Sequence, residues 1–135
     1  LRMQRQCDNA LELARFLQGL GVDIEVNYPG LEKSPYHEIA EKQFRNGYGA
    51  IVTVRTGSKE KAFSIINSLK IPLIISNIGD TKTLVIHPES TIAAHISDEE
   101  KLQSGVFEDL IRISVGIEDI EDLKEDFKQA IENNR

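Results

Sequence analysis

Apolar residues recur at three- and four-residue steps in several stretches of the chain, a spacing typical of helices that bury one face. The first stripe ends before Gly19 and consists of Met3, Cys7, Ala10, Leu11, Ala14 and Leu17. It predicts a helix over residues 2–18. Further helices are expected from Pro35 to about Phe44, from Ser58 to near Leu69, from Ser97 to Gly105, and along Ile120, Leu123, Phe127 and Ile131.

Three of these helices have start signals with a physical basis. In Ser34-Pro35 the serine can cap free amides, and the fixed backbone angle of proline suits the first helical position. Ser58 is expected to cap the third helix. Ser97 and Glu100 have the spacing of a capping box, in which each side chain accepts from the other residue's amide.

Short runs rich in apolar and β-branched residues lie between the helices and predict strands. They are residues 22–26, 50–54, 71–75, 83–86 and 110–115. The segment from Asn77 to Thr81 is polar and contains a glycine, so we expect a loop there. The alternation of helices and short strands, without a linker or repeat, predicts one layered α/β domain over residues 1–135, a sheet covered by helices.

Composition and charge argue against several classes of function. Hydrophobic residues make up 40% and charged residues 28% of the chain, which is typical of a globular domain. The net charge of −6 and the lack of a basic stripe argue against a nucleic-acid partner. No apolar run approaches the about 20 residues that cross a bilayer, and the single Cys7 cannot form an internal disulfide. We therefore expect a cytoplasmic protein without a membrane partner.

The residues offer little catalytic chemistry by themselves. His37, His87 and His95 are too irregularly spaced for a metal motif, so no metal site is predicted. Cys7 lies on the apolar stripe of the first helix, where burial would make it a packing residue. Arg112 lies within an apolar strand, where an inward charge needs a partner. From periodicity alone, an outward-facing surface arginine is an equal alternative.

Two longer motifs resemble those of a known family of proteins. The segment Asn77-Ile78-Gly79-Asp80-Thr81-Lys82-Thr83-Leu84-Val85-Ile86-His87-Pro88, followed by Arg112-Ile113-Ser114-Val115-Gly116-Ile117-Glu118-Asp119-Ile120, resembles the closing part of the Cys/Met-metabolism pyridoxal-phosphate enzymes. Arg2-Met3, Asn9-Ala10, Phe16-Leu17, Asn27 to Leu31 and Ser34 to His37 are also similar to that family. The resemblance covers essentially the whole chain.

This resemblance implies the fold: an α/β two-layer sandwich (α+β) whose small, mainly antiparallel sheet packs against the first and last helices. It is the carboxy-terminal domain of the aspartate-aminotransferase-like fold. It also implies that Arg112 binds the substrate α-carboxylate with its forked donors. The family's pyridoxal 5'-phosphate is held by a lysine and a phosphate loop in a preceding domain. No cofactor-binding or catalytic residue is therefore expected here, and the chain alone should be inactive.

Asn77 stands where the lyase branches of the family usually have a serine, and its loop looks like the O-acetylhomoserine sulfhydrylase branch. That branch implies O-acetylhomoserine and sulfide as substrates, homocysteine as product, and a homo-oligomeric full-length enzyme. The alternatives are methionine γ-lyase, cystathionine γ-synthase, or a non-catalytic amino-acid-binding or interaction module. One segment departs from the family's Pro-Ala-Ser-x-Thr-His: it reads Pro88-Glu89-Ser90-Thr91-Ile92-Ala93, and His95 does not replace the lost histidine.

Overall fold

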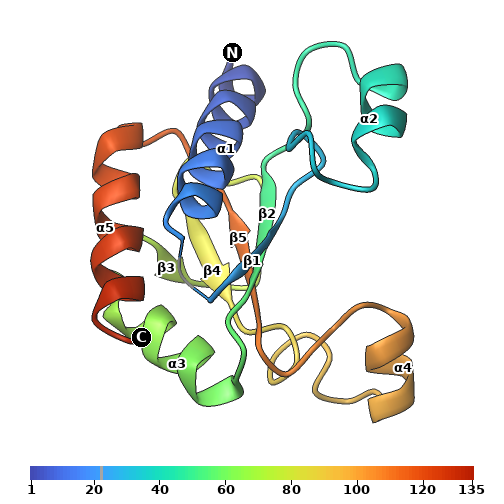
Figure 1. Cartoon of the computed structure of the whole chain (residues 1–135), viewed down its shortest axis with the longest axis vertical. Helices are drawn as coiled ribbons and strands as arrows, with labels where there is room; N and C mark the ends of the chain where they lie inside the picture. The colour runs from blue at the N-terminus through green and yellow to red at the C-terminus, as the bar shows by residue number, and fades with distance from the viewer. Residues whose placement is uncertain (22) are drawn as a thin grey trace.

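The computed structural model describes residues 1–21 and 23–135, which form five helices around a five-stranded sheet (Figure 1). The helices are α1 (Arg2–Gly19), α2 (His37–Gln43), α3 (Lys59–Ser68), α4 (Asp98–Gln103) and α5 (Ile120–Glu132). The strands are β1 (Glu25–Asn27), β2 (Ile51–Arg55), β3 (Leu73–Ile74), β4 (Leu84–Ile86) and β5 (Leu110–Ser114). No helix in this described part is long and apolar enough to cross a bilayer.

The sheet has the strand order β1-β2-β5-β4-β3. All neighbours are antiparallel except β3 and β4, which run parallel. The expected two-layer, mainly antiparallel domain is therefore confirmed. The strand predicted over residues 71–75 is reduced to two paired residues at the sheet edge, and Pro72 before them has no amide to donate.

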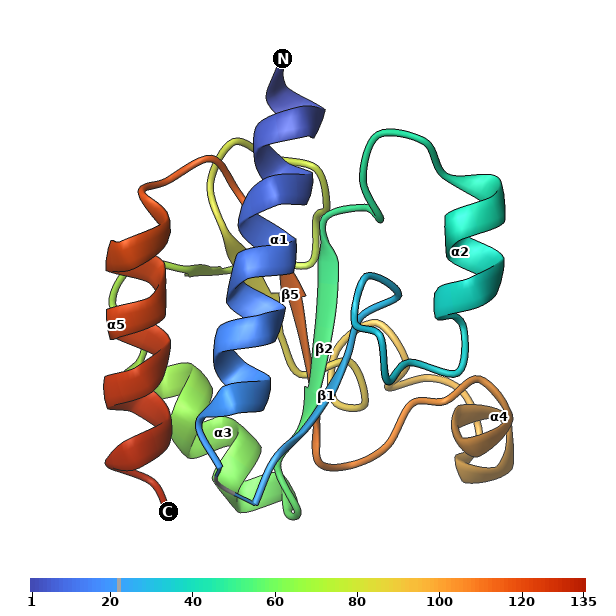
Figure 2. The same cartoon turned by 45° about the horizontal axis from the view of Figure 1, so that its top comes forward.

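Helices α1, α3 and α5 form one layer against the sheet, whereas α2 and α4 stand away from it (Figure 2). The core between these layers contains Leu13, Leu17, Val52, Ile113 and Phe127, each at most 2% exposed. Leu17 and Phe127 belong to the predicted stripes of the first and last helices. Leu13, which was not in a predicted stripe, joins the core, whereas Met3, which was, is 50% exposed and does not. Within residues 1–21 and 23–135, no helix packs directly on the opposite face of the sheet, so side chains on that face can line a site.

The capping predictions were correct for two helices. Ser58 Oγ accepts from the amide of Lys61, and Ser97 and Glu100 form the reciprocal capping box. The prediction for Ser34 was wrong: α2 begins at His37, and Ser34 Oγ accepts from the amide of Tyr36 in the preceding turn. The first predicted strand is observed from Glu25, and its expected start at Val22 lies outside the described residues.

Candidate functional site

A polar row crosses the open face of the sheet. Asn27 on β1 is opposite Thr53 on β2, which is opposite Arg112 on β5. Directly opposed residues of antiparallel strands point to the same face, so the three side chains lie side by side. All three line one cleft. Arg112 points to the face of the sheet away from the helical layer, as the outward-facing alternative expects, and it is half-buried there in a cleft wall.

The guanidinium of Arg112 uses only some of its hydrogen-bond donors within the described residues. Its Nη2 donates to the carbonyl of Ser76 at 2.7 Å, while its buried Nε has no hydrogen-bond partner among the described residues. Burial lowers the pKa of this guanidinium from its ordinary value, and an arginine side chain keeps its charge in proteins. No ion pair within residues 1–21 and 23–135 involves Arg112. A partly desolvated cation without a carboxylate partner can bind an anionic ligand.

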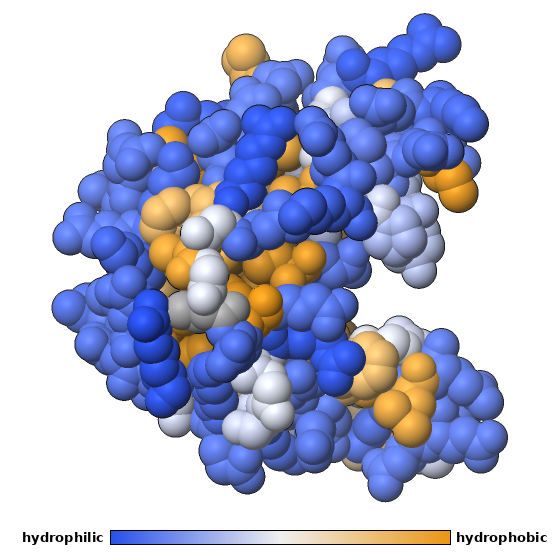
Figure 3. Space-filling view, viewed as in Figure 1, coloured by the Kyte–Doolittle hydropathy of each residue, from blue (hydrophilic) through white to orange (hydrophobic). Residues whose placement is uncertain are grey.

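The cleft has a volume of about 800 Å³ and lies between two projecting lobes, visible as a notch in the space-filling view (Figure 3). One wall is the turn before α2, which includes Ser34 and Tyr36. The other wall is formed by Ile92 and by the segment after α4 that ends at Phe107. Ile92, at one of the positions that depart from the family motif, is part of this wall. It presents a partly exposed apolar surface there.

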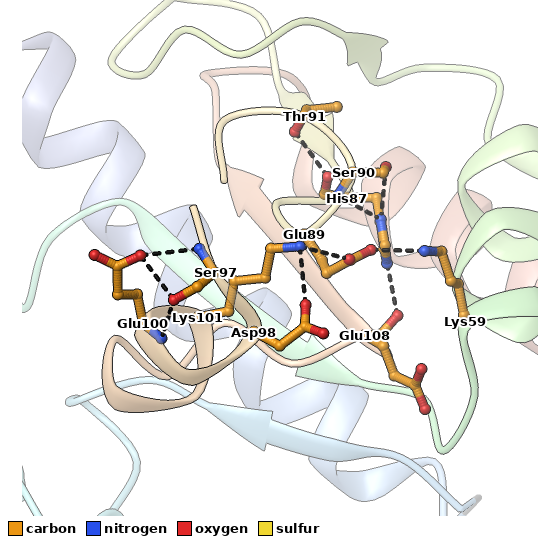
Figure 4. A network of polar contacts seen from close by, with 10 residues as sticks. All are labelled: Lys59, His87, Glu89, Ser90, Thr91, Ser97, Asp98, Glu100, Lys101 and Glu108. Atoms are coloured by element: carbon orange, nitrogen blue, oxygen red, sulfur yellow. Dashed lines mark hydrogen bonds and ion pairs between the residues drawn. The ribbon is translucent and has the colours of Figure 1, made fainter. Parts of the chain in front are cut away.

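A network of ion pairs holds the second wall in place (Figure 4). Glu89, just after β4, accepts from Lys59 Nζ at 2.7 Å through one oxygen and from Lys101 Nζ at 3.0 Å through the other. Lys59 begins α3 and Lys101 lies in α4, so one carboxylate joins three segments. These contacts lower the pKa of Glu89 to about 2, the hydrogen bond from Lys59 having the largest effect. The carboxylate is therefore ionised at neutral pH.

His87 is hydrogen-bonded at the start of the segment that forms the second wall. Its Nε2 lies 2.6 Å from the carbonyl of Glu108, which can only accept, so Nε2 donates. Nδ1 then accepts from the Ser90 hydroxyl at 2.8 Å. Phe63 packs against the ring with centroids 4.6 Å apart. His87 is 3% exposed, and these contacts explain it as a packing residue.

The second family-like motif secures the loop that carries Asn77. Ser114 Oγ accepts from the amide of Gly79 at 3.0 Å. Glu118 accepts from both the amide and the hydroxyl of Thr83, at 2.6 and 2.8 Å. Gly116 donates its amide to the same threonine hydroxyl. The alternating residues after Arg112 thus attach residues 79–83 to the end of β5.

Asn77 is exposed and lines a separate hollow of about 370 Å³, together with Arg2 and residues 78–81. Arg112 is not among the residues that line this hollow. The two predicted site residues are linked through the backbone, because Arg112 binds the carbonyl of Ser76, the residue before Asn77. Arg112 thus contacts the backbone next to Asn77, but the two side chains line different cavities.

Three residues that line the cleft with Arg112 were not predicted as site residues: Asn27, Thr53 and Tyr36. Asn27 and Tyr36 belong to segments that resemble the family, so a signal existed for them. Thr53 had none, because its place beside Arg112 depends on the pairing of β2 with β5. Strand register cannot be read from one strand's own sequence.

Two described lysines are shielded from solvent and paired with carboxylates, and one lysine lines the Arg112 cleft. The two most shielded lysine side chains in ion pairs, Lys101 and Lys124, are 11% and 17% exposed and contact carboxylates. Lys33 alone among the lysines of residues 1–21 and 23–135 lines the Arg112 cleft, and it is exposed. A cofactor-binding lysine needs a depressed pKa, which burial or a nearby cation provides. Lys33 is not buried in this way.

Comparison with known proteins gives a consistent result. The family model of the Cys/Met metabolism PLP-dependent enzymes matches residues 1–132. Homocysteine synthase from Schizosaccharomyces pombe is 43% identical over 133 residues, which is 98% of this chain and 31% of that protein. O-acetyl-L-homoserine sulfhydrylase 1 from Thermus thermophilus is 42% identical over 97% of this chain and 31% of its own length. The chain therefore spans about a third of these relatives.

A solved structure is similar over nearly the whole chain. It is an O-acetylhomoserine (thiol)-lyase from Campylobacter jejuni, 37% identical, with a TM-score of 0.93 over 97% of this chain and 31% of that chain. That protein carries a pyridoxyl-phosphate-modified lysine, which lies outside the region that this chain matches.

Proposed function

Because the chain belongs to the family of Cys/Met metabolism PLP-dependent enzymes, we propose that its Arg112 binds the α-carboxylate of an O-acylated homoserine in a full-length O-acetylhomoserine sulfhydrylase. The observation that supports this role is the half-buried guanidinium at the base of the cleft, which has no carboxylate partner among the described residues. A planar fork of donors matches a carboxylate. The proposal takes residues 1–135 as one domain of a larger protein.

In this proposal the chain binds and orients the substrate. Pyridoxal phosphate, bound by another part of the protein, supplies the electron sink that lets acetate leave the γ-carbon and sulfide replace it. Arg112 holds the carboxylate, with Thr53 and Asn27 beside it on the sheet. Ile92 and Phe107 offer an apolar wall to the substrate methylenes. Homocysteine is the proposed product, and a homo-oligomer the proposed assembly of the full-length enzyme.

Substitution of Arg112 in a full-length protein that contains this chain tests the role. Each hydrogen bond to a charged group contributes about 1.5–3 kcal/mol, so Arg112→Ala should lower kcat/KM for O-acetylhomoserine about a hundredfold or more. The kcat/KM of Arg112→Lys should lie between those of wild type and Arg112→Ala, because lysine keeps the charge but loses the forked pair of donors. Arg15→Ala is the matched control, since Arg15 is an exposed arginine of α1 paired with Glu12.

Steady-state kinetics with sulfide checks this, and circular dichroism confirms that each variant is folded. An efficiency of Arg112→Ala within about twofold of wild type would show that the carboxylate role is wrong. Formation of 2-oxobutanoate and ammonia in place of homocysteine would instead identify a γ-lyase. Lack of any cofactor-dependent turnover would favour an amino-acid-binding or interaction module.

A further inference from the structure

A second arginine lies farther along the same cleft. Arg55 is two residues after Thr53 on β2, so its side chain points to the same face of the sheet. Arg55 is paired with Glu25 on β1 and with Leu110 on β5. These three residues form the next row on this face after the row of Asn27, Thr53 and Arg112. The two rows are roughly 7 Å apart along the strand, a span that an extended O-acylhomoserine can bridge.

Arg55 differs from Arg112 because its charge is already compensated. Its Nε donates to Asp109 Oδ1 at 3.0 Å, and its guanidinium lies 4.0 Å above the centre of the Phe107 ring. Asp109 is well fixed, since its side chain is 7% exposed and its other oxygen accepts from the amide of Gly57 at 3.0 Å. Asp109 thus compensates the charge of Arg55 and occupies its Nε donor, so a ligand carboxylate near Arg55 also meets the negative charge of Asp109.

The two ends of the cleft therefore differ in charge. At the Arg112 end, no described carboxylate forms an ion pair with the arginine. At the other end, Asp109 neutralises Arg55, and Glu25 adds a second carboxylate directly opposite it. Lys33 also lines the cleft, but it is exposed and its ammonium stays hydrated. A ligand with one carboxylate fits this pattern, whereas a second carboxylate at the far end meets no free, desolvated cation.

We infer that Asp109 is a specificity-determining residue: by neutralising Arg55 it makes the cleft select homoserine esters with an uncharged acyl group over esters whose acyl group ends in a carboxylate. The inference rests on the proposed function of the cleft and names its substrate class. Asp109 lies behind Arg55 and acts through it. Loss of its charge should release the Arg55 guanidinium, because an asparagine can still accept from Gly57 but turns its NH₂ group toward Arg55.

The test uses a full-length protein that contains this chain and two ligands, O-acetylhomoserine and O-succinylhomoserine. Binding of each is measured by isothermal titration calorimetry without sulfide, and turnover is measured separately with sulfide. In Asp109→Asn the preference for the acetyl ester, as a ratio of Kd values, should fall about tenfold or more, because Arg55 gains a charge-assisted contact. Adding Arg55→Met to this variant should restore the wild-type ratio.

Asp126→Asn is the matched control for a mere loosening of the fold. Asp126 is 6% exposed, against 5% for Asp109, and it also accepts backbone amides, those of Lys70 and Ile71. It does not line the cleft, so its variant should keep the wild-type ratio. An unchanged ratio in folded Asp109→Asn, or an equal change in Asp126→Asn, overturns the inference. Ester binding without sulfide-dependent turnover would contradict the proposed function alone, and binding of neither ester would contradict both.

Discussion

Gly116 lies against backbone on one side, so a side chain there has no space. A Cβ at this position would overlap the Thr81 carbonyl oxygen and approach the carbonyl carbon of Lys82 to 2.6 Å. Backbone atoms cannot move aside as a flexible side chain can. Gly116→Ala should therefore destabilise the fold by about 1–3 kcal/mol, the usual cost of overpacking, measured by urea denaturation of the purified chain. It should also loosen residues 79–83, which contain the partners of Ser114 and Glu118.

Gly19→Ala serves as the control for this change. Gly19 is the last residue of α1, and a Cβ there would meet nothing within 4 Å. Alanine is the better helix former by up to about 1 kcal/mol, so this variant should be as stable as wild type or more stable. Equal destabilisation by both substitutions would contradict the steric explanation for Gly116.

Asn77 is the second residue whose role can be tested by itself. It is exposed in a hollow beside Gly79, so its amide is free to reach a ligand from outside this chain. We expect Asn77→Ser in the full-length protein to shift the product from homocysteine toward 2-oxobutanoate and ammonia, because the shorter hydroxyl loses the reach and the second donor of the amide. Product analysis with O-acetylhomoserine and sulfide measures this. An unchanged product ratio would leave Asn77 as a turn residue only.

At the scale of elements, Glu89 connects α3 and α4 to the turn after β4. Its folded pKa of about 2 lies below the ordinary 4.5, so the ionised form stabilises the fold. This contribution is complete above about pH 4.5 and is lost as the pH falls toward 2. Glu89→Gln should remove it at neutral pH, and its stability should change less than that of wild type between pH 5 and 3, as shown by urea midpoints at each pH.

The same variant also tests whether Glu89 stabilises the cleft wall. Since Glu89 holds the wall that contains Ile92 and Phe107, Glu89→Gln should increase hydrogen exchange across residues 87–109. Glu12→Gln is a suitable control, because Glu12 is half-exposed and pairs only with Lys124 and Arg15 among the described residues, away from the cleft. Parallel stability curves for wild type and Glu89→Gln would contradict the assigned pH window.

For the whole molecule, we expect the chain produced alone to fold without catalysing the reaction. Its core joins α1, α3 and α5 to the central strands without any other chain. The relatives are about three times as long, and the modified lysine of the Campylobacter jejuni structure lies outside the region that this chain matches. Circular dichroism should show a folded α/β protein, and addition of pyridoxal phosphate should produce neither a defined cofactor absorbance nor homocysteine. Turnover by the purified chain would contradict this prediction.

The sequence by itself determined the features that depend on neighbours along the chain. The stripes of α1 and α5, the caps of Ser58 and Ser97, and the family motifs around Asn77 and Arg112 are all local patterns. They were sufficient to predict the layered fold and the family. The start of α2 was misplaced because a serine can close a turn as easily as it caps a helix.

Only the tertiary structure decided what surrounds Arg112. The register of β1, β2 and β5 places Asn27 and Thr53 in its row, and the lobe held by Glu89 completes the cleft. The compensation of Arg55 by Asp109, which is 54 residues away in sequence, was equally invisible in the chain. Such contacts depend on strand pairing and on the path of long loops, and neither leaves a periodic signal in the segments that take part.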